Sequence, residues 1–193
     1  RERIDGLHKG QMPIYEPGLE ELVRRNLEEQ RLSFTTELKT AVQQSSVIFI
    51  AVGTPLGAGK RPDLSALSAV AKSIGGALKS GDLVVLRSTV PIGTTRGPVI
   101  QMLEKTSGRK AGEDFFVAFA PERTVEGKAL EELRTLPQVI GGVNRMSANL
   151  ASDIFNLMTH TIHIVDSLEE AEVVKLINNT YRDVTFAFAN EVS

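Results

Sequence analysis

The stretch SVIFIAVGTP, residues 46–55, indicates the fold class of this chain. Its apolar run is unbroken up to Val52 and stops at Gly53-Thr54-Pro55. Strands buried on both faces of a parallel sheet have such runs, because helices cover both faces. Two further runs, DLVVLRS at 82–88 and DFFVAFA at 114–120, also end in short polar loops. Helical periodicity between them favours repeated βα units, and we therefore predict an α/β fold with a doubly wound parallel sheet.

Apolar periodicity along the rest of the chain predicts the other elements. The last helix is expected to continue to the final residue. Helices are expected at 1–9, 18–29, 37–43, 66–79, 95–104, 146–158 and 167–193, and further strands at 32–35, 138–142 and 161–165.

Composition limits the classes of function. The 193 residues are 41% hydrophobic, which suits a folded domain with a core rather than a disordered chain. The net charge is −2 without long like-charge blocks, which argues against nucleic acid as a partner. No run of about 18 apolar residues could span a membrane, and we expect a cytoplasmic protein. Because there is no cysteine, the chain offers no thiolate metal site and no sulfur nucleophile, and we expect no metal.

Three polar loops follow the three apolar strands, at Thr54-Pro55, Thr89-Val90-Pro91 and Pro121-Glu122-Arg123. In open parallel sheets, ligands bind outside the carboxyl ends of the strands, so we expect these loops to share one edge that holds the site. The hydroxyls of residues 54 and 89 can hydrogen-bond a ribose or a phosphate, although a threonine that only caps a turn explains either one equally well. A helix that begins near 91–95 adds N–H groups that attract anions.

The motif PERTVEG places Glu122, Arg123 and Glu126 directly after a buried strand. Carboxylates in such a place can orient a water molecule or accept a proton, and arginine can grip a phosphate or a sugar oxygen. A solvated loop without a function explains this composition at least as well.

The last helix carries Lys175, Asn179 and Arg182 at spacings of four and three residues, which sets them on one face. A buried lysine can have a lowered pKa and act as a general base, and asparagine can hold a water molecule or an oxyanion. On an isolated helix, an ordinary surface lysine would be the more common case. The apolar residues at 184–188 favour packing of this helix against another protein surface.

Five motifs in order resemble one family from end to end of the chain: PIYEPGLEELV, AVGTP, STVPIGTT, APERTVEGKALEELRTLPQVIGG and EAEVVKLINNTYRDVTFAFANE. They are similar to the UDP-glucose/GDP-mannose dehydrogenases, the nucleotide-sugar 6-dehydrogenases. This resemblance implies a Rossmann-like NAD-binding domain over 1–166, followed by the start of a long central helix and dimerisation domain over 167–193. It also implies a homodimer that oxidises a sugar C6 alcohol to the carboxylate with NAD, in the synthesis of surface polysaccharides. PERTVEG and NTYRDVTFAFANE look more like the members that act on UDP-N-acetyl-mannosamine, or on UDP-N-acetyl-glucosamine, than like UDP-glucose dehydrogenases.

The resemblance assigns four residues to the cofactor. Thr54, Pro55 and Thr89 would contact NAD. Glu126 would lie near the nicotinamide and help to position water, which makes it both a cofactor-binding and a catalytic candidate.

A second set would line the UDP-sugar site. By resemblance, Lys175 would accept the proton and stabilise the alkoxide, Asn179 would hold the developing oxyanion, and Arg182 would contact an acetamido sugar nucleotide. Glu122 is a further catalytic candidate. The substrate-binding candidates are Glu122, Arg123, Thr124, Lys175, Asn179 and Arg182.

Some parts implied by the resemblance are not in these 193 residues. No GxGxxG fingerprint occurs, and we expect this turn and the first strand of the domain to precede Arg1. The catalytic cysteine and the UDP-binding domain would follow Ser193. Without the glycine turn and the thiol, these residues alone are expected to be inactive. The motif PIYEPG shapes the entry to a helix but receives no chemical role.

Three alternatives stay open. UDP-glucose is the nearest rival substrate. A complete, non-catalytic nucleotide-binding or dimerisation module would keep the fold without the reaction. Another Rossmann enzyme, such as a hydroxy-acid dehydrogenase, would share the order of strands and loops but would not need Lys175, Asn179 and Arg182 together.

Overall fold

The three apolar runs form three neighbouring parallel strands of a five-stranded sheet. A computed structural model describes residues 2–192, and its strands lie in the order β1-β2-β3-β4-β5. They are β1 (Val47–Ile50), β2 (Leu83–Leu86), β3 (Phe116–Phe119), β4 (Gln138–Gly142) and β5 (Ile162–Ile164). β1 pairs parallel with β2, and β2 pairs parallel with β3, in a register that aligns Val47, Leu83 and Phe116.

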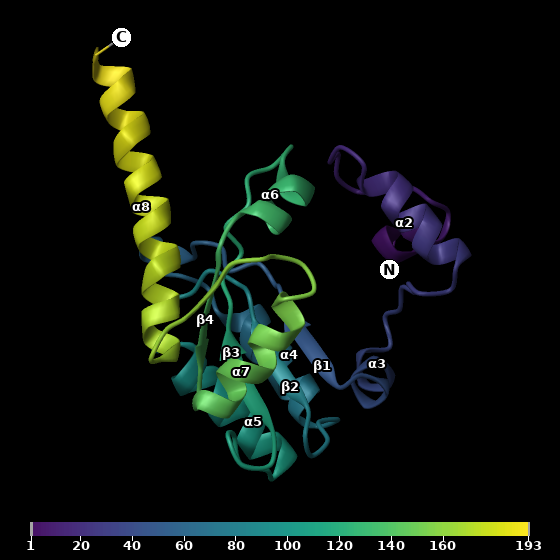
Figure 1. The fold of residues 1–193 in the computed structure, drawn as a ribbon. Helices are drawn as coiled ribbons and strands as arrows, with labels where there is room; N and C mark the ends of the chain where they lie inside the picture. The colour runs from purple at the N-terminus through teal and green to yellow at the C-terminus, as the bar shows by residue number, and fades with distance from the viewer. Residues whose placement is uncertain (1, 193) are drawn as a thin grey trace.

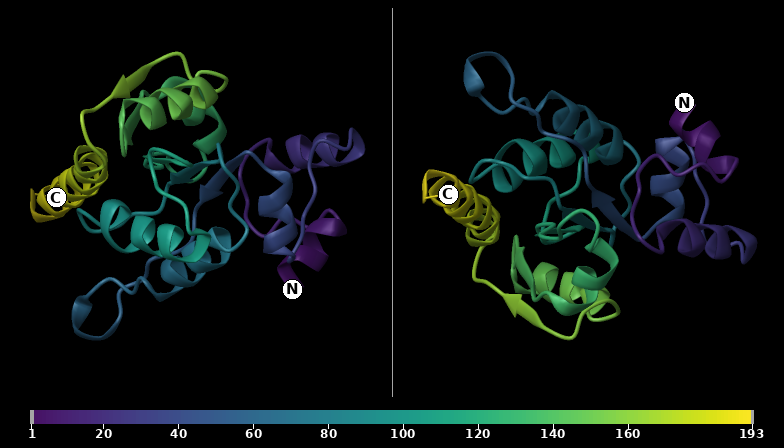
Figure 2. Two further views of the ribbon diagram at one scale, coloured as in Figure 1. Left: turned by 90° about the horizontal axis from the view of Figure 1, so that it is seen from below. Right: turned by 90° about the horizontal axis from the view of Figure 1, so that it is seen from above.

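Helices cover both faces of this sheet (Figures 1 and 2). The helices of the described chain are α1 (Glu2–His8), α2 (Leu19–Glu28), α3 (Leu38–Gln44), η1 (Ala58–Lys60), α4 (Ser65–Gly75), η2 (Thr95–Val99), α5 (Ile100–Ser107), α6 (Ala129–Thr135), α7 (Arg145–Phe155) and α8 (Leu168–Val192). Val84 and Leu86 of β2 share a core with α4 and α5, while Leu83 and Val85 share the opposite core with α7. The predicted doubly wound, Rossmann-like α/β class is confirmed.

Both ends of the described chain are helical, as predicted. Arg1 and Ser193, which the predicted helices included, lie outside the described residues. Helices α1 and α2 lie to one side of the sheet, while α8 rises on the other side and projects beyond it (Figure 1). No helix within residues 2–192 combines the length and the apolarity that a membrane crossing needs.

One strand direction differs from the prediction. β4 runs antiparallel to β3, with Phe119 opposite Gly141, so the sheet is mixed rather than wholly parallel. Between these strands the chain contains one loop and the short helix α6. A parallel neighbour requires a crossover that carries the chain back along the sheet, and a chain that turns back directly enters the next strand antiparallel. α7 then supplies such a crossover, and β5 pairs parallel with β4.

Three local predictions also need correction. Residues 32–35 form no strand, because no described strand lies beside them to pair with their N–H and C=O groups. Helix α6 was not predicted, since its short apolar pattern lies inside the loop motif. The helix expected at 95–104 begins as a wide π-turn, η2, because Pro98 has no N–H to donate to the preceding turn.

The start of α8 lies unusually close to β4. A Cβ atom on Gly141 would lie 2.1 Å from the carbonyl oxygen of Ser167 and 3.0 Å from the Cβ of Ala171. Glycine is therefore required here for its size. This contact sets where α8 begins, and from there the helix runs past the edge at which β1, β2 and β3 end (Figure 1).

We predict that Gly141→Ala lowers the free energy of unfolding by about 2 kcal/mol, because the added methyl group overlaps backbone at the start of α8. Gly53→Ala is the matched control, since nothing lies within 4 Å of its Cβ position. Urea denaturation of both variants measures the difference. Equal stability of the two variants would contradict the close approach of α8 to β4.

Candidate active site at the carboxyl edge of the sheet

The loops after β1 and β2 touch at the carboxyl edge of the sheet. The Thr54 hydroxyl donates to the carbonyl oxygen of Thr89 at 2.6 Å, and the Ser88 hydroxyl donates to the carbonyl oxygen of Val52 at 2.7 Å. Because β3 lies parallel beside β2, its loop emerges at the same edge. The expected common edge is confirmed, whereas the cofactor roles of Thr54 and Thr89 stay predictions.

A buried carboxylate from α8 occupies the N-terminal end of η2. Glu172 is fully buried, and it accepts from the Gly93 N–H at 2.5 Å, the Thr95 N–H at 2.8 Å and the Thr95 hydroxyl at 2.6 Å. The first N–H groups of a helix have no partner within the helix, and a negative charge is favourable there. These N–H groups do attract an anion, as predicted, but those of Gly93 and Thr95 are not free, because Glu172 of the chain itself occupies them.

An ion pair one turn earlier on α8 adds a second contact between α8 and η2. Arg96 donates to Glu169 through Nε at 2.6 Å and through Nη2 at 3.2 Å. Glu169 and Glu172 are three residues apart on α8, so both face η2. Lys175 follows Glu172 by the same spacing and lies on the same side of the helix. The two carboxylates thus fix α8 in rotation and in height over the carboxyl edge.

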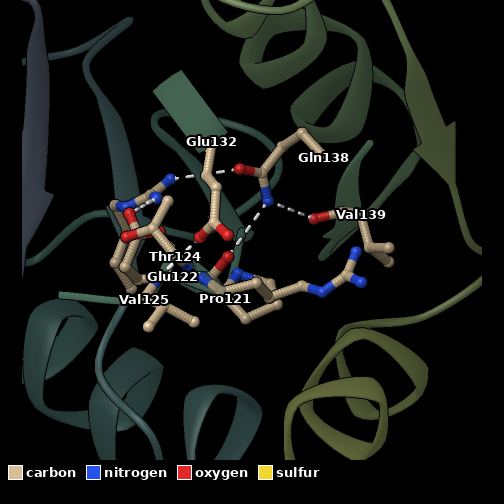
Figure 3. A network of polar contacts seen from close by, with 9 residues as sticks. Pro121, Glu122, Thr124, Val125, Glu132, Gln138 and Val139 are labelled. Carbon is tan, nitrogen blue, oxygen red and sulfur yellow. Dashed lines mark hydrogen bonds and ion pairs between the residues drawn. The ribbon is translucent and has the colours of Figure 1, made fainter. Parts of the chain in front are cut away.

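Glu122 is tied into its own loop. One of its oxygens pairs with Arg87, and the other accepts from the N–H groups of Arg123 at 2.8 Å and Thr124 at 2.9 Å (Figure 3). Burial pushes the pKa of Glu122 upward, but Arg87 and the Thr124 N–H outweigh it and lower the pKa below its usual range. The side chain is therefore an ionised acceptor with little capacity left for a substrate.

Arg87 is a site residue that sequence reasoning missed. Its guanidinium lies 5.0 Å from the centre of the Phe155 ring and donates to Gln138 at 3.4 Å, besides pairing with Glu122. Gln138 in turn donates to the Pro121 carbonyl oxygen at 3.2 Å. Arg87 thereby joins the ends of β2, β3 and β4. A signal was available, because a mostly buried arginine at the end of the run DLVVLRS needs a carboxylate partner.

Lys175 lies where the charged groups of the site meet. Burial lowers the pKa of Lys175, and the positive charges of Arg182, Arg123 and Arg87 lower it further, while the Glu122 carboxylate acts in the opposite direction. The side chain is half-buried. Its neutral amine is thus populated at lower pH than that of an ordinary lysine.

The other predicted residues differ in how they are placed. Asn179 is half-buried one turn beyond Lys175, and Arg182 is exposed. Glu126 is exposed and makes no hydrogen bond with any described residue, so its carboxylate is available. Arg123 donates to the Pro137 carbonyl oxygen at 3.0 Å and contacts the connection into β4 rather than the open edge.

Two groups of predicted residues can be separated at this edge. Thr54, Pro55 and Thr89 lie at the ends of β1 and β2, and within residues 2–192 no hydrogen bond or ion pair joins them to Glu122 or Lys175. No group of three or more potential metal-ligating side chains occurs in that part of the chain either.

Similarity to known proteins covers most of the chain. Residues 1–159 match the UDP-glucose/GDP-mannose dehydrogenase family, NAD binding domain. The chain belongs to this family. The predicted resemblance is confirmed, and NAD is the cofactor of the matching domain.

Three relatives illustrate the range of the family. The UDP-N-acetyl-D-mannosamine dehydrogenase of Pyrococcus horikoshii is 36% identical over 98% of this chain and 45% of its own length, and its solved structure superimposes with a TM-score of 0.93. The GDP-mannose 6-dehydrogenase of Pseudomonas aeruginosa is 38% identical over 98% of this chain and 44% of its own length. The UDP-glucose 6-dehydrogenase of Bacillus subtilis is 34% identical over 99% of this chain and 41% of its own length.

Similarity to these relatives identifies the family but not the substrate. Their identities are nearly equal although their names give three different sugar nucleotides, so identity does not select the substrate of this family member. The chain also spans less than half the length of each relative.

The residues at the ends of β1 and β2 fit part of a bound NAD. The Thr89 hydroxyl makes no hydrogen bond with a described residue and is free to donate, while Thr54 retains only its acceptor capacity. The backbone of Gly53 is exposed and open, with nothing within 4 Å of a Cβ position, so a ligand can approach it closely. The amides of Gly93 and Thr95 do not contribute, because Glu172 occupies them.

We predict that Glu172→Gln lowers the free energy of unfolding by about 2 kcal/mol, because the new amide group must point an N–H at another buried N–H. Glu169→Gln is the matched control on the same helix face and should cost less than about 1 kcal/mol, since its ion pair is partly exposed. Thermal and urea unfolding measure both variants. Equal losses of unfolding free energy in the two variants would contradict a larger contribution of the buried carboxylate to stability.

Proposed function

We propose that this chain is the NAD-binding part of a nucleotide-sugar 6-dehydrogenase. The sugar nucleotide whose C6 alcohol it oxidises is a UDP sugar of the UDP-N-acetyl-mannosamine type. The observation that carries the proposal is Lys175, a half-buried lysine with a lowered pKa at the carboxyl edge of the sheet. A base of this kind suits an alcohol, whose proton must leave as the carbon is oxidised.

Each candidate then has a chemical task. Lys175 takes the proton of the C6 hydroxyl and stabilises the oxygen that remains. Asn179, one turn further along α8, donates its amide N–H to the same oxygen. Bound NAD supplies the hydride acceptor, and Thr54 and Thr89 hold it at the ends of β1 and β2.

The loop after β3 carries two carboxylates, Glu122 and Glu126, which have different tasks. Glu122, held by Arg87 and by two backbone N–H groups, keeps the loop in shape and faces Lys175 as a fixed negative charge. Oxidation of an alcohol to a carboxylate transfers two hydrides, one to each of two NAD molecules, and takes up one water molecule. Glu126, which is exposed and has no partner among the described residues, would position that water molecule. We thus favour a structural task for Glu122 over direct catalysis.

Positive charge favours a nucleotide sugar over a neutral sugar. The positive charges of Arg182, Arg123 and Arg87 all lower the pKa of Lys175, so the amine lies in a net positive field that would attract an anionic substrate. Of these, Arg182 is exposed and has no ion pair with a described residue, which suits contact with the substrate.

The chain then comprises two parts, and the second part forms a dimer interface. Residues 1–166 form the NAD-binding domain, and 167–193 begin a central helix through which two copies form a homodimer in the cytoplasm. Support for the dimer comes from large apolar side chains that α8 exposes, namely Ile177, Tyr181, Val184, Phe186, Phe188 and Val192.

The first test measures NADH formation by the complete protein that contains these residues, with UDP-N-acetyl-mannosamine, UDP-N-acetyl-glucosamine, UDP-glucose and GDP-mannose compared side by side. We expect the highest kcat/KM with UDP-N-acetyl-mannosamine and a loss of at least about 100-fold in kcat for Lys175→Met. A preference for UDP-glucose would keep the family and overturn the substrate class. Absence of NADH with all four would favour a non-catalytic module.

The lowered pKa of Lys175 predicts a pH effect. The neutral amine is the active form, so kcat rises with pH as Lys175 loses its proton. Arg182→Gln removes a positive charge that lowers this pKa, so the pKa rises and the increase in kcat moves to higher pH. Arg145→Gln, on α7, is the control and should leave the profile in place. A profile unchanged by Arg182→Gln would contradict the assignment of Lys175 as the base.

A further inference from the structure

The motif PIYEPG contacts the loop that carries Glu126. Glu16 accepts from the Gly127 N–H at 2.8 Å through one carboxylate oxygen and from the Ala129 N–H at 2.8 Å through the other. Ala129 is the first residue of α6, so Glu16 caps this helix from a position 113 residues earlier in the chain. The residue directly before α6, Lys128, makes no side-chain capping hydrogen bond.

The prolines and glycine around Glu16 explain why its carboxylate is well placed. Pro17 fixes the backbone directly after it, and Gly18 adopts a left-handed φ of 79°. The Leu19 N–H closes the turn on the Glu16 carbonyl oxygen at 3.1 Å. A Cβ on Gly18 would lie 3.6 Å from the Leu130 side chain, so the turn rests directly on α6. The rigid approach to α2 therefore holds a carboxylate against a distant loop.

Three carboxylates accept hydrogen bonds from the backbone of the loop at 122–128. Glu122 accepts from the first two N–H groups of the loop, and Glu132 accepts from the Val125 N–H at 2.6 Å (Figure 3). Glu16 holds the far end, where Gly127 has a left-handed φ of 87°. Glu126 lies between the Val125 and Gly127 anchors and is itself unattached.

We propose that Glu16 is a positioning residue that fixes the far end of the loop and thereby holds Glu126 at the site. Loss of its carboxylate frees the Gly127 and Ala129 N–H groups, and the backbone can then rotate at Gly127, because glycine accepts many conformations. Glu126 is the nearest functional side chain to that point. The catalytic part of this inference rests on the proposed function, whereas the contact itself does not.

The contact is tested first, by hydrogen–deuterium exchange over peptides that cover 125–131 in the complete protein. In Glu16→Gln we expect exchange at Gly127 and Ala129 to become about 10-fold faster, because the amide keeps one acceptor and turns its own N–H groups toward the loop. Glu20→Gln, exposed on α2 and without a partner among the described residues, is the matched control. Unchanged exchange in Glu16→Gln would overturn the proposal.

Steady-state kinetics on the same variants then separate positioning from simple stability. We expect Glu16→Gln to lower kcat about 10-fold while its melting temperature and its KM for NAD stay close to those of the parent. Faster exchange with an unchanged kcat would overturn the positioning role. If the parent oxidises no nucleotide sugar, the proposed function fails with it, and the exchange result alone then decides whether Glu16 holds the loop.

Discussion

The buried carboxylate of Glu172 is the constraint on which the site depends. A negative charge without solvent needs full hydrogen bonding, and Gly93 and Thr95 supply three donors to it. Because these donors belong to the loop after β2, the charge can be satisfied only if α8 lies over that loop with one rotation. The close contact at Gly141 sets the height of the same helix. The contacts of Glu172 and of Gly141 together determine the position of Lys175, one turn further along α8.

Charge is divided at this edge between groups that hold the structure and groups that remain available. Glu122, Glu132, Glu16 and Glu172 all accept from backbone N–H groups and are used within the chain. Among the described residues, Glu126 has no such partner. A carboxylate engaged by fixed donors makes a stable local charge, whereas a free one can bind water or accept a proton. This division distinguishes the carboxylates that hold the backbone from the one that is available more clearly than their order in the motif does.

The sequence predicted most of what depends on local pattern. The unbroken apolar runs identified β1, β2 and β3, because strands covered on both faces have no polar alternation. The direction of β4 and the absence of a strand at 32–35 depend on which strands lie side by side, and neither follows from periodicity. At the site, Lys175 and Glu126 were singled out from their motifs and then assigned roles by the resemblance. The structure leaves Lys175 half-buried and Glu126 exposed, and their roles stay predictions. Arg87, Glu172 and Glu16 act through contacts between residues 35 to 113 positions apart, which spacing along one element does not reveal.

The most direct test of the central claim is a crystal structure of the complete protein with NAD and a UDP sugar. The geometry predicts the Lys175 amine and the Asn179 amide within hydrogen-bond distance of the sugar C6 oxygen, with Glu172 still accepting from Gly93 and Thr95. A sugar bound away from α8, or a Lys175 side chain directed elsewhere while Glu172 keeps its contacts, would contradict the assignment of this edge as the site of oxidation.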